Sequence, residues 1–104
     1  MSKSISVLFD ELRNIPFPEL GKVIGDFVLY DSLLAGTASS FLAGVPIDLE
    51  AIPVPDQETE TALNTLEKKS TLDRQEAEFL KYAQLLDELR KKIIKAIKAG
   101  HRGK

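Results

Sequence analysis

The sequence predicts an all-α fold, a small four-helix bundle with a buried second helix and a long amphipathic C-terminal helix. Apolar residues recur every three or four positions in four segments, the spacing that places side chains on one helical face. Proline-containing stretches separate the first two segments and the second from the third. At 104 residues the chain has the size of one domain, so we expect residues 1–104 to form a single helical domain.

The first helix is predicted over residues 5–15. Either Ser4 or Ser6 can accept a hydrogen bond from an amide at its start. The alternation of polar and apolar residues over 4–7 could instead begin a strand, but no partner strand follows. Pro16 closes the segment, because a proline disfavours helical geometry in the residue before it.

The second helix is predicted over residues 18–43, with Pro18 at its first position and Glu19 near its positive end. Beyond residue 26 its apolar and small side chains fall on all sides, which is typical of a helix surrounded by protein or lipid. The uncharged run 32–47 has 16 residues, fewer than the roughly 20 that a membrane span needs. We therefore expect a buried core helix and no transmembrane segment.

Small residues form a row within this helix, because Gly36, Ser40 and Gly44 lie four positions apart. Such a row lets another backbone approach closely, either within the domain or in a second copy of the chain. Alternatively, Gly36 could interrupt the helix and Thr37 could cap a new one. The sequence leaves open whether there is one helix or two collinear pieces.

A proline-rich linker is predicted over 45–55, followed by a short surface helix over 56–69. We expect the linker to lie extended along the domain and to bury some of its aliphatic side chains, which are Leu49, Ile52 and Val54. Asp56 is suited to cap the third helix, whose first turn is acidic and whose last turn is basic, as the helix dipole favours.

The last helix is predicted over 71–99, with Ser70 and Asp73 in a reciprocal capping arrangement and Gly100 at its end. It would reach about 43 Å, more than a compact domain of this size spans, so its end should project or contact a partner. Its apolar face is wide enough for a bundle. Four aliphatic residues widen that face or fall outside it, and we expect them to contact another chain: Leu80, Leu85, Ile94 and Ile97.

No constellation of residues indicates catalysis. The chain lacks cysteine, and its one histidine, His101, lies in a predicted flexible basic tail at 100–104. Gly21 and Gly25 lack the lysine and hydroxyl residue that follow in a phosphate-binding loop. The sequence therefore predicts a non-catalytic protein without catalytic, cofactor-binding or metal-binding residues, and without a cofactor.

Charge is distributed unevenly along the chain. All 16 acidic residues precede position 90, whereas half of the 14 basic residues lie at 90–104. One row in this region could bind phosphates or another anionic surface: Lys91, Lys95, Lys98 and Arg102. The same cations are also typical of a helix C-terminus, and Asp87 can pair with Lys91.

Together these features predict a helical protein–protein interaction or oligomerisation module in the cytoplasm, a subunit or accessory factor of a larger assembly. Its partner would be another copy of the chain or a different protein. The interaction surface would combine the small-residue row of the second helix with the four aliphatic residues of the last. The alternative is binding of nucleic acid or an anionic surface through the basic end of the last helix.

Overall fold

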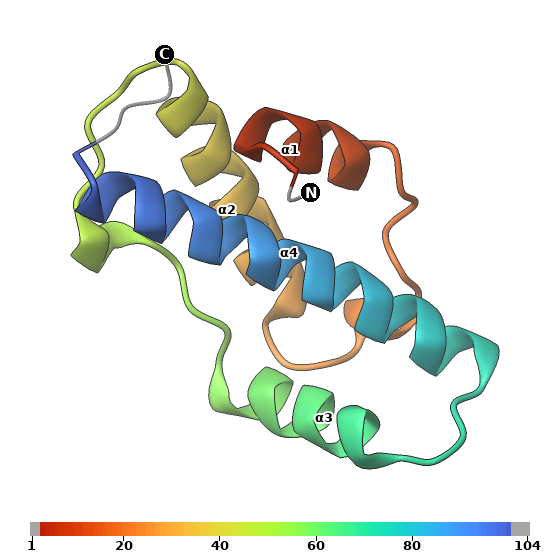
Figure 1. The fold of residues 1–104 in the computed structure, drawn as a ribbon. Helices are drawn as coiled ribbons and strands as arrows, with labels where there is room; N and C mark the ends of the chain where they lie inside the picture. Colours follow the sequence, from red (N-terminus) through yellow and green to blue (C-terminus); the bar gives the residue numbers. More distant parts are fainter. Residues whose placement is uncertain (1–2, 101–104) are drawn as a thin grey trace.

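A computed structural model describes residues 3–100, and within this range all regular secondary structure is helical (Figure 1). It therefore confirms the predicted small all-α bundle. The four α-helices are α1 (Ile5–Arg13), α2 (Phe27–Leu42), α3 (Gln57–Lys68) and α4 (Arg74–Lys98). Two single turns of 3₁₀-helix lie at Leu20–Lys22 and Leu49–Ala51.

The long helix α4 is the central element of the molecule. In Figure 1 it lies between α1 and α3, with α2 crossing behind it, and all three helices contact it. Its 25 residues extend about 37 Å, and the longest dimension of the molecule is 40 Å. Its C-terminal end does not project, because the start of α1 lies beside Ala96 and Ala99, and contact of this end with a partner stays a prediction. It ends where predicted, at Gly100, which has a φ of +80°.

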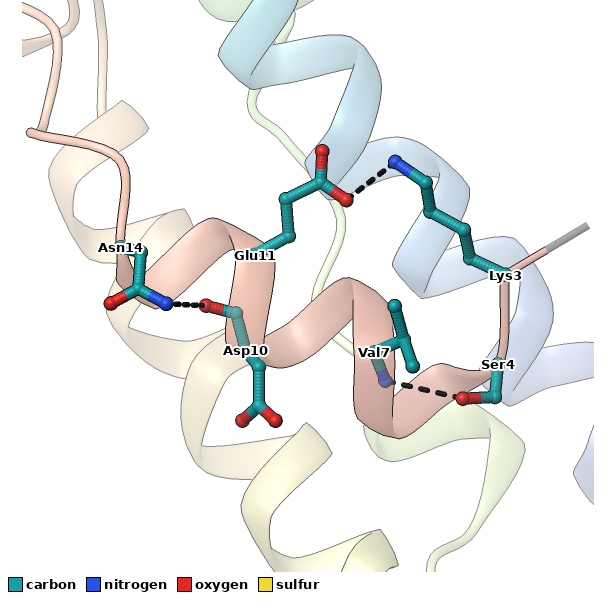
Figure 2. A network of polar contacts seen from close by, with 6 residues as sticks. All are labelled: Lys3, Ser4, Val7, Asp10, Glu11 and Asn14. Atoms are coloured by element: carbon teal, nitrogen blue, oxygen red, sulfur yellow. Dashed lines mark hydrogen bonds and ion pairs between the residues drawn. The ribbon is translucent and has the colours of Figure 1, made fainter.

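Local polar contacts fix both ends of α1 (Figure 2). The Ser4 hydroxyl accepts a hydrogen bond of 3.2 Å from the Val7 amide, so Ser4 rather than Ser6 is the cap. At the other end the Asn14 side chain donates to the Asp10 carbonyl at 3.0 Å. The helix ends at Arg13, two residues earlier than predicted, because Pro16 disfavours helical geometry at the residue before it.

The predicted start of the second helix at residue 18 is wrong, since α2 begins at Phe27. The chain turns at Gly25, where φ is +48°, a conformation that glycine adopts without strain. A Cβ at this position would lie 2.7 Å from Oδ1 of Asp56, whose Oδ2 accepts a 3.3 Å hydrogen bond from the Asp26 amide. The helix then continues through Gly36 without interruption, so the break lies at Gly25.

Capping side chains also determine where α3 and α4 begin. Asp56 caps α3 as predicted, accepting from the Thr59 amide at 3.0 Å. The helix α4 starts at Arg74, three residues later than predicted, because Asp73 and Glu76 rather than Ser70 form the reciprocal pair. The Glu76 amide donates to Asp73 at 2.8 Å, and the Asp73 amide donates to Glu76 at 3.1 Å.

The linker between α2 and α3 is bound to α4 by one long-range hydrogen bond. Nε of Arg90 donates to the carbonyl of Pro53 at 2.8 Å. Ile52 is buried whereas Leu49 and Val54 are 42% and 63% exposed, so the linker buries some of its aliphatic side chains, as predicted. Arg90 thus positions this linker.

Phe27 lies at the centre of the core, fully buried at the start of α2. Its ring is 4.8 Å from Phe79, 5.7 Å from Phe17 and 6.1 Å from Tyr82, measured between centroids. These are distances at which tilted and edge-to-face aromatic pairs attract one another. The other fully buried large apolar side chains of the core come from α1, α2 and α4: Leu8, Leu34, Phe79, Leu86, Leu89 and Ile93.

Candidate functional site

The predicted small-residue row divides between α2 and the turn that ends it. Gly36 is exposed, and a Cβ there would meet no atom within 4 Å. Ser40 is partly buried. Gly44 has a φ of +85° and lies beyond the helix, where its amide donates to Phe41 and the Val45 amide donates to Ser40, both at 3.0 Å. This pair of bonds is a Schellman motif, so Gly44 terminates α2.

The four aliphatic residues predicted to contact a partner are partly covered within the chain. They pack against the buried core, and each retains only part of its surface for solvent: Leu80, Leu85, Ile94 and Ile97. Leu80 also lines a cavity between α3 and α4. This set therefore offers less free apolar surface than the sequence indicated.

The largest exposed aliphatic side chains of α2 lie on the face turned away from the core. Val28, Leu29 and Leu33 are 49%, 55% and 51% exposed. The expectation that protein surrounds nearly the whole of this helix is wrong for the single chain. The physical reason is that α2 packs mainly against α1, α4 and the turn at residues 20–22, which leaves its remaining side open.

This open side carries no charge. We call it the α2 surface, and its members are exposed apolar, small or hydroxyl residues: Val28, Leu29, Ser32, Leu33, Gly36, Ser39 and Ala43. The one charged residue of α2 is Asp31, which bonds to Tyr82 of α4 at 2.6 Å. Sequence reasoning did not select Val28, Leu29 and Leu33 as site residues. The lack of charged residues on this face was the signal available in the sequence, and it was interpreted as a sign that the face is buried.

Asp31 and Tyr82 also line a cavity of about 210 Å³ between α1, α2 and α4. Burial raises the pKa of Asp31, although the hydrogen bond from Tyr82 opposes this effect. Burial, followed by the bond to Asp31, raises the pKa of Tyr82 above its usual value. At neutral pH the tyrosine is therefore a protonated donor, which suits a structural link between two helices.

Three of the predicted anion-binding residues, Lys91, Lys95 and Lys98, lie along one face of the continuous helix α4, as their spacing predicted. Lys91 forms an ion pair with Asp87 at 3.0 Å, and Lys98 is the exposed last residue of α4. Arg102 lies outside the described residues. Lys95 also joins Lys3 and Lys92 around a groove of about 420 Å³, where the start of α1 meets the end of α4.

Two further observations concern metal binding and membrane spanning. Over residues 3–100, no three histidine, cysteine or acidic side chains are grouped so that they could hold a metal ion. In the same range every helix is too short or too polar to cross a membrane. His101 lies outside this range.

Comparison with protein families, with curated proteins and with solved structures finds no match to this chain.

Proposed function

We propose that the protein is a non-catalytic oligomerisation module that pairs with a second copy of itself through the α2 surface. The observation that supports this most directly is the half-exposed set Val28, Leu29 and Leu33 on a helix face without charge. Exposed aliphatic side chains in a contiguous group are typical of an interface, whereas scattered ones are ordinary. The predicted cytoplasmic location stays a prediction.

The α2 surface is suited to a two-fold interface, in which the same patch of both copies meets itself. Its first half carries the large side chains Leu29 and Leu33, and its second half carries the small residues Gly36, Ser39 and Ala43. In an antiparallel arrangement, the leucines of each copy would pack onto the small residues of the other. Since Gly36 has open space around it, the two helices could approach closely there.

Charge and size further define the proposed dimer. The α2 surface carries no charged residue, so no like charges meet when it pairs with a second copy of itself. The helix has 16 residues and is about 24 Å long, so its face alone is smaller than the roughly 800 Å² per partner of a standard interface. Exposed Val23 and Val45 flank its two ends and could enlarge the contact. We expect a dissociation constant on the order of 10 μM.

Size-exclusion chromatography with light scattering tests the proposal across a concentration series. The mass should rise from one chain of 11.5 kDa towards twice that value as the concentration passes through the micromolar range. Leu33→Glu should hold the mass at one chain, because pairing would bring the new charges into an apolar contact. Gly36→Leu should act similarly through bulk alone, since the monomer has room for the side chain.

Val7→Glu is the matched control. Val7 is 51% exposed, as Leu33 is, but lies on α1. This variant should therefore associate like the unmodified chain. A mass of one chain at every concentration, or equal loss of association in both glutamate variants, would contradict pairing through α2.

Binding of nucleic acid or another anionic surface remains the alternative proposal. The groove formed by Lys3, Lys92 and Lys95 favours it, although Lys3 is paired with Glu11 at 2.5 Å. Heparin binding that disappears at moderate salt and in Lys92→Gln/Lys95→Gln would support it. Heparin binding that both lysine substitutions leave unchanged would contradict it.

A further inference from the structure

A cavity of about 360 Å³ lies between α3 and α4 and does not involve the α2 surface. It falls within the size range of small-molecule sites in proteins. Its inner part is apolar, since Phe27 at the centre of the core, Leu63 of α3 and Leu80 of α4 all line it. A ligand with an aromatic or branched aliphatic group would therefore remove apolar surface from water here.

The charged groups that line the cavity are all acidic. Glu60 and Glu67 come from α3 and Asp87 comes from α4. Asp87 is paired with Lys91, whereas Glu60 and Glu67 form no ion pair with any residue between 3 and 100. The two glutamates thus leave negative charge beside the apolar lining.

The hydroxyl of Tyr30 is a further polar group at this cavity, and it reaches solvent, since among residues 3–100 the Thr59 hydroxyl is the buried side-chain polar group without a partner. Tyr30 is only 6% exposed and lines the cavity, yet its hydroxyl forms no hydrogen bond to any described residue. Tyr82, the other tyrosine of the chain, bonds to Asp31. The Tyr30 hydroxyl is therefore accessible to a molecule in the cavity.

The charges around Tyr30 are consistent with this placement. Burial raises the pKa of Tyr30 to about 12, and the negative charges that act on it include Asp87 and Glu60 of the cavity lining. The nearby cation is Arg90, which donates to Pro53 and is not part of the lining. The hydroxyl is therefore protonated at neutral pH and lies between Arg90, whose charge acts on it most strongly, and several acidic groups.

We propose that the cavity between α3 and α4 binds a small organic cation, an ammonium group attached to an aromatic or branched aliphatic body. The body would occupy the lining formed by Phe27, Leu63 and Leu80. The ammonium would donate to Glu60 or Glu67, and the Tyr30 hydroxyl would be a further polar contact. Charge-assisted hydrogen bonds of this kind favour the cation over neutral molecules of the same shape.

Three probes of similar shape and different charge test the proposal on the full chain. These are 2-phenylethylammonium, 2-phenylethanol and 3-phenylpropionate, each followed by backbone amide NMR shifts. The ammonium probe should give saturable shifts within residues 60–67 and 80–87, with a dissociation constant of about 1 mM. The alcohol and the carboxylate should bind about ten-fold more weakly, and added salt should weaken only the ammonium probe.

Substitutions within the lining locate the contacts. Glu60→Gln/Glu67→Gln should weaken binding of the ammonium probe roughly five-fold. Tyr30→Phe should weaken it about three-fold while keeping the ring in place. The matched control is Glu50→Gln/Glu58→Gln, which changes the net charge equally at exposed positions outside the lining and should leave binding unchanged.

Several results would overturn the proposal. One is equal binding of the ammonium and the alcohol, which would identify only a hydrophobic cavity. Others are shifts confined to other parts of the chain, or no saturable shifts at about 10 mM probe. If Glu60→Gln/Glu67→Gln and Glu50→Gln/Glu58→Gln weakened binding of the ammonium probe equally, the preference for cations would come from the net charge of the protein and not from the cavity. Each of these outcomes is independent of whether the chain forms a dimer.

Discussion

The Tyr82 hydroxyl donates a 2.6 Å hydrogen bond to Oδ1 of Asp31, which joins α4 to the one charged residue of α2. Both groups are withdrawn from solvent, since Tyr82 is buried and Asp31 is partly buried. A bond to a carboxylate in such surroundings contributes more than one between neutral exposed groups. This contact therefore helps to fix how the two longest helices pack together.

Tyr82→Phe should destabilise the fold by about 2 kcal/mol, because it removes the donor and leaves the Asp31 carboxylate without this partner. Urea unfolding followed by circular dichroism measures the difference. The control is Lys81→Ala, which changes an exposed neighbouring residue and should have little effect on stability. Phe79→Leu would not serve as a control because it alters the core. A stability equal to that of the unmodified chain would show that water replaces the bond.

Asp31→Asn should change how stability depends on pH. Burial raises the pKa of Asp31 above its usual 3.8, so the folded state binds this proton more tightly than the unfolded state. The stabilisation that comes from the protonated Asp31 carboxyl is present below pH 3.8 and is lost as the pH rises through the folded-state pKa. Between pH 3 and pH 7, Asp31→Asn should therefore gain stability relative to the unmodified chain. Parallel pH profiles in urea unfolding would contradict this.

Asp56 should have the opposite pH dependence. Contacts with Thr59, first its side chain and then its amide, lower the pKa of Asp56, and the Asp26 amide adds to this effect. Its contribution is present above the usual value of 3.8 and is lost as the pH falls through the lowered folded-state pKa. Asp56→Ala should lower the melting temperature by several degrees at pH 7 and by less at pH 2, measured by thermal unfolding. An equal loss at both pH values would exclude the charge as the cause.

Gly25→Ala and Gly36→Ala should change stability in opposite directions. Gly25 has a φ of +48°, and a Cβ there would lie 2.7 Å from Asp56 and 2.8 Å from Thr59, so alanine should destabilise by about 1–3 kcal/mol. Gly36 lies inside α2 with open space around it, so alanine should stabilise by about 0.5–1 kcal/mol. Chemical unfolding at a concentration that keeps the chain monomeric measures both. Similar effects of both substitutions would contradict the assigned turn.

Phe27→Ala should be among the most destabilising single substitutions, with a loss of about 3–5 kcal/mol. The side chain is fully buried and its ring lies 4.8 Å from that of Phe79, so truncation would leave a cavity at the centre of the core. Phe9→Ala, at a partly buried position on α1, should have a smaller effect in the same urea unfolding experiment. Equal losses for the two would show that Phe27 has no special position in the core.

The sequence predicted helices well where local signals determine them. The buried face of α4 includes Phe79, Leu86 and Ile93, which lie seven positions apart along an amphipathic helix, and Asp56 caps α3 as its position indicated. The start of α2 could not be predicted, because the apolar spacing continues from Leu20 into Phe27. The turn at Gly25 is held by Asp56, which is far away in sequence.

The candidate surfaces were harder to predict than the helices. A helix with a single charged residue provides no polar face to mark the side that other elements leave open, so the exposure of Leu33 depends on where α1 and α4 pack. The cavity between α3 and α4 depends on side chains from several elements, including Tyr30, Glu60 and Asp87. The hydrophobic periodicity of one segment cannot show which side chains from different elements line the same cavity.

The groove lined by Lys3 and Ser4 on one side and by Ala96 and Ala99 on the other places the two ends of the described chain next to each other. A short peptide joining the ends would therefore bridge little distance, and new ends could be opened in the exposed linker around Val54. The fold is thus compatible with circular permutation, and a cyclised form should unfold at higher temperature because its unfolded state has less conformational freedom.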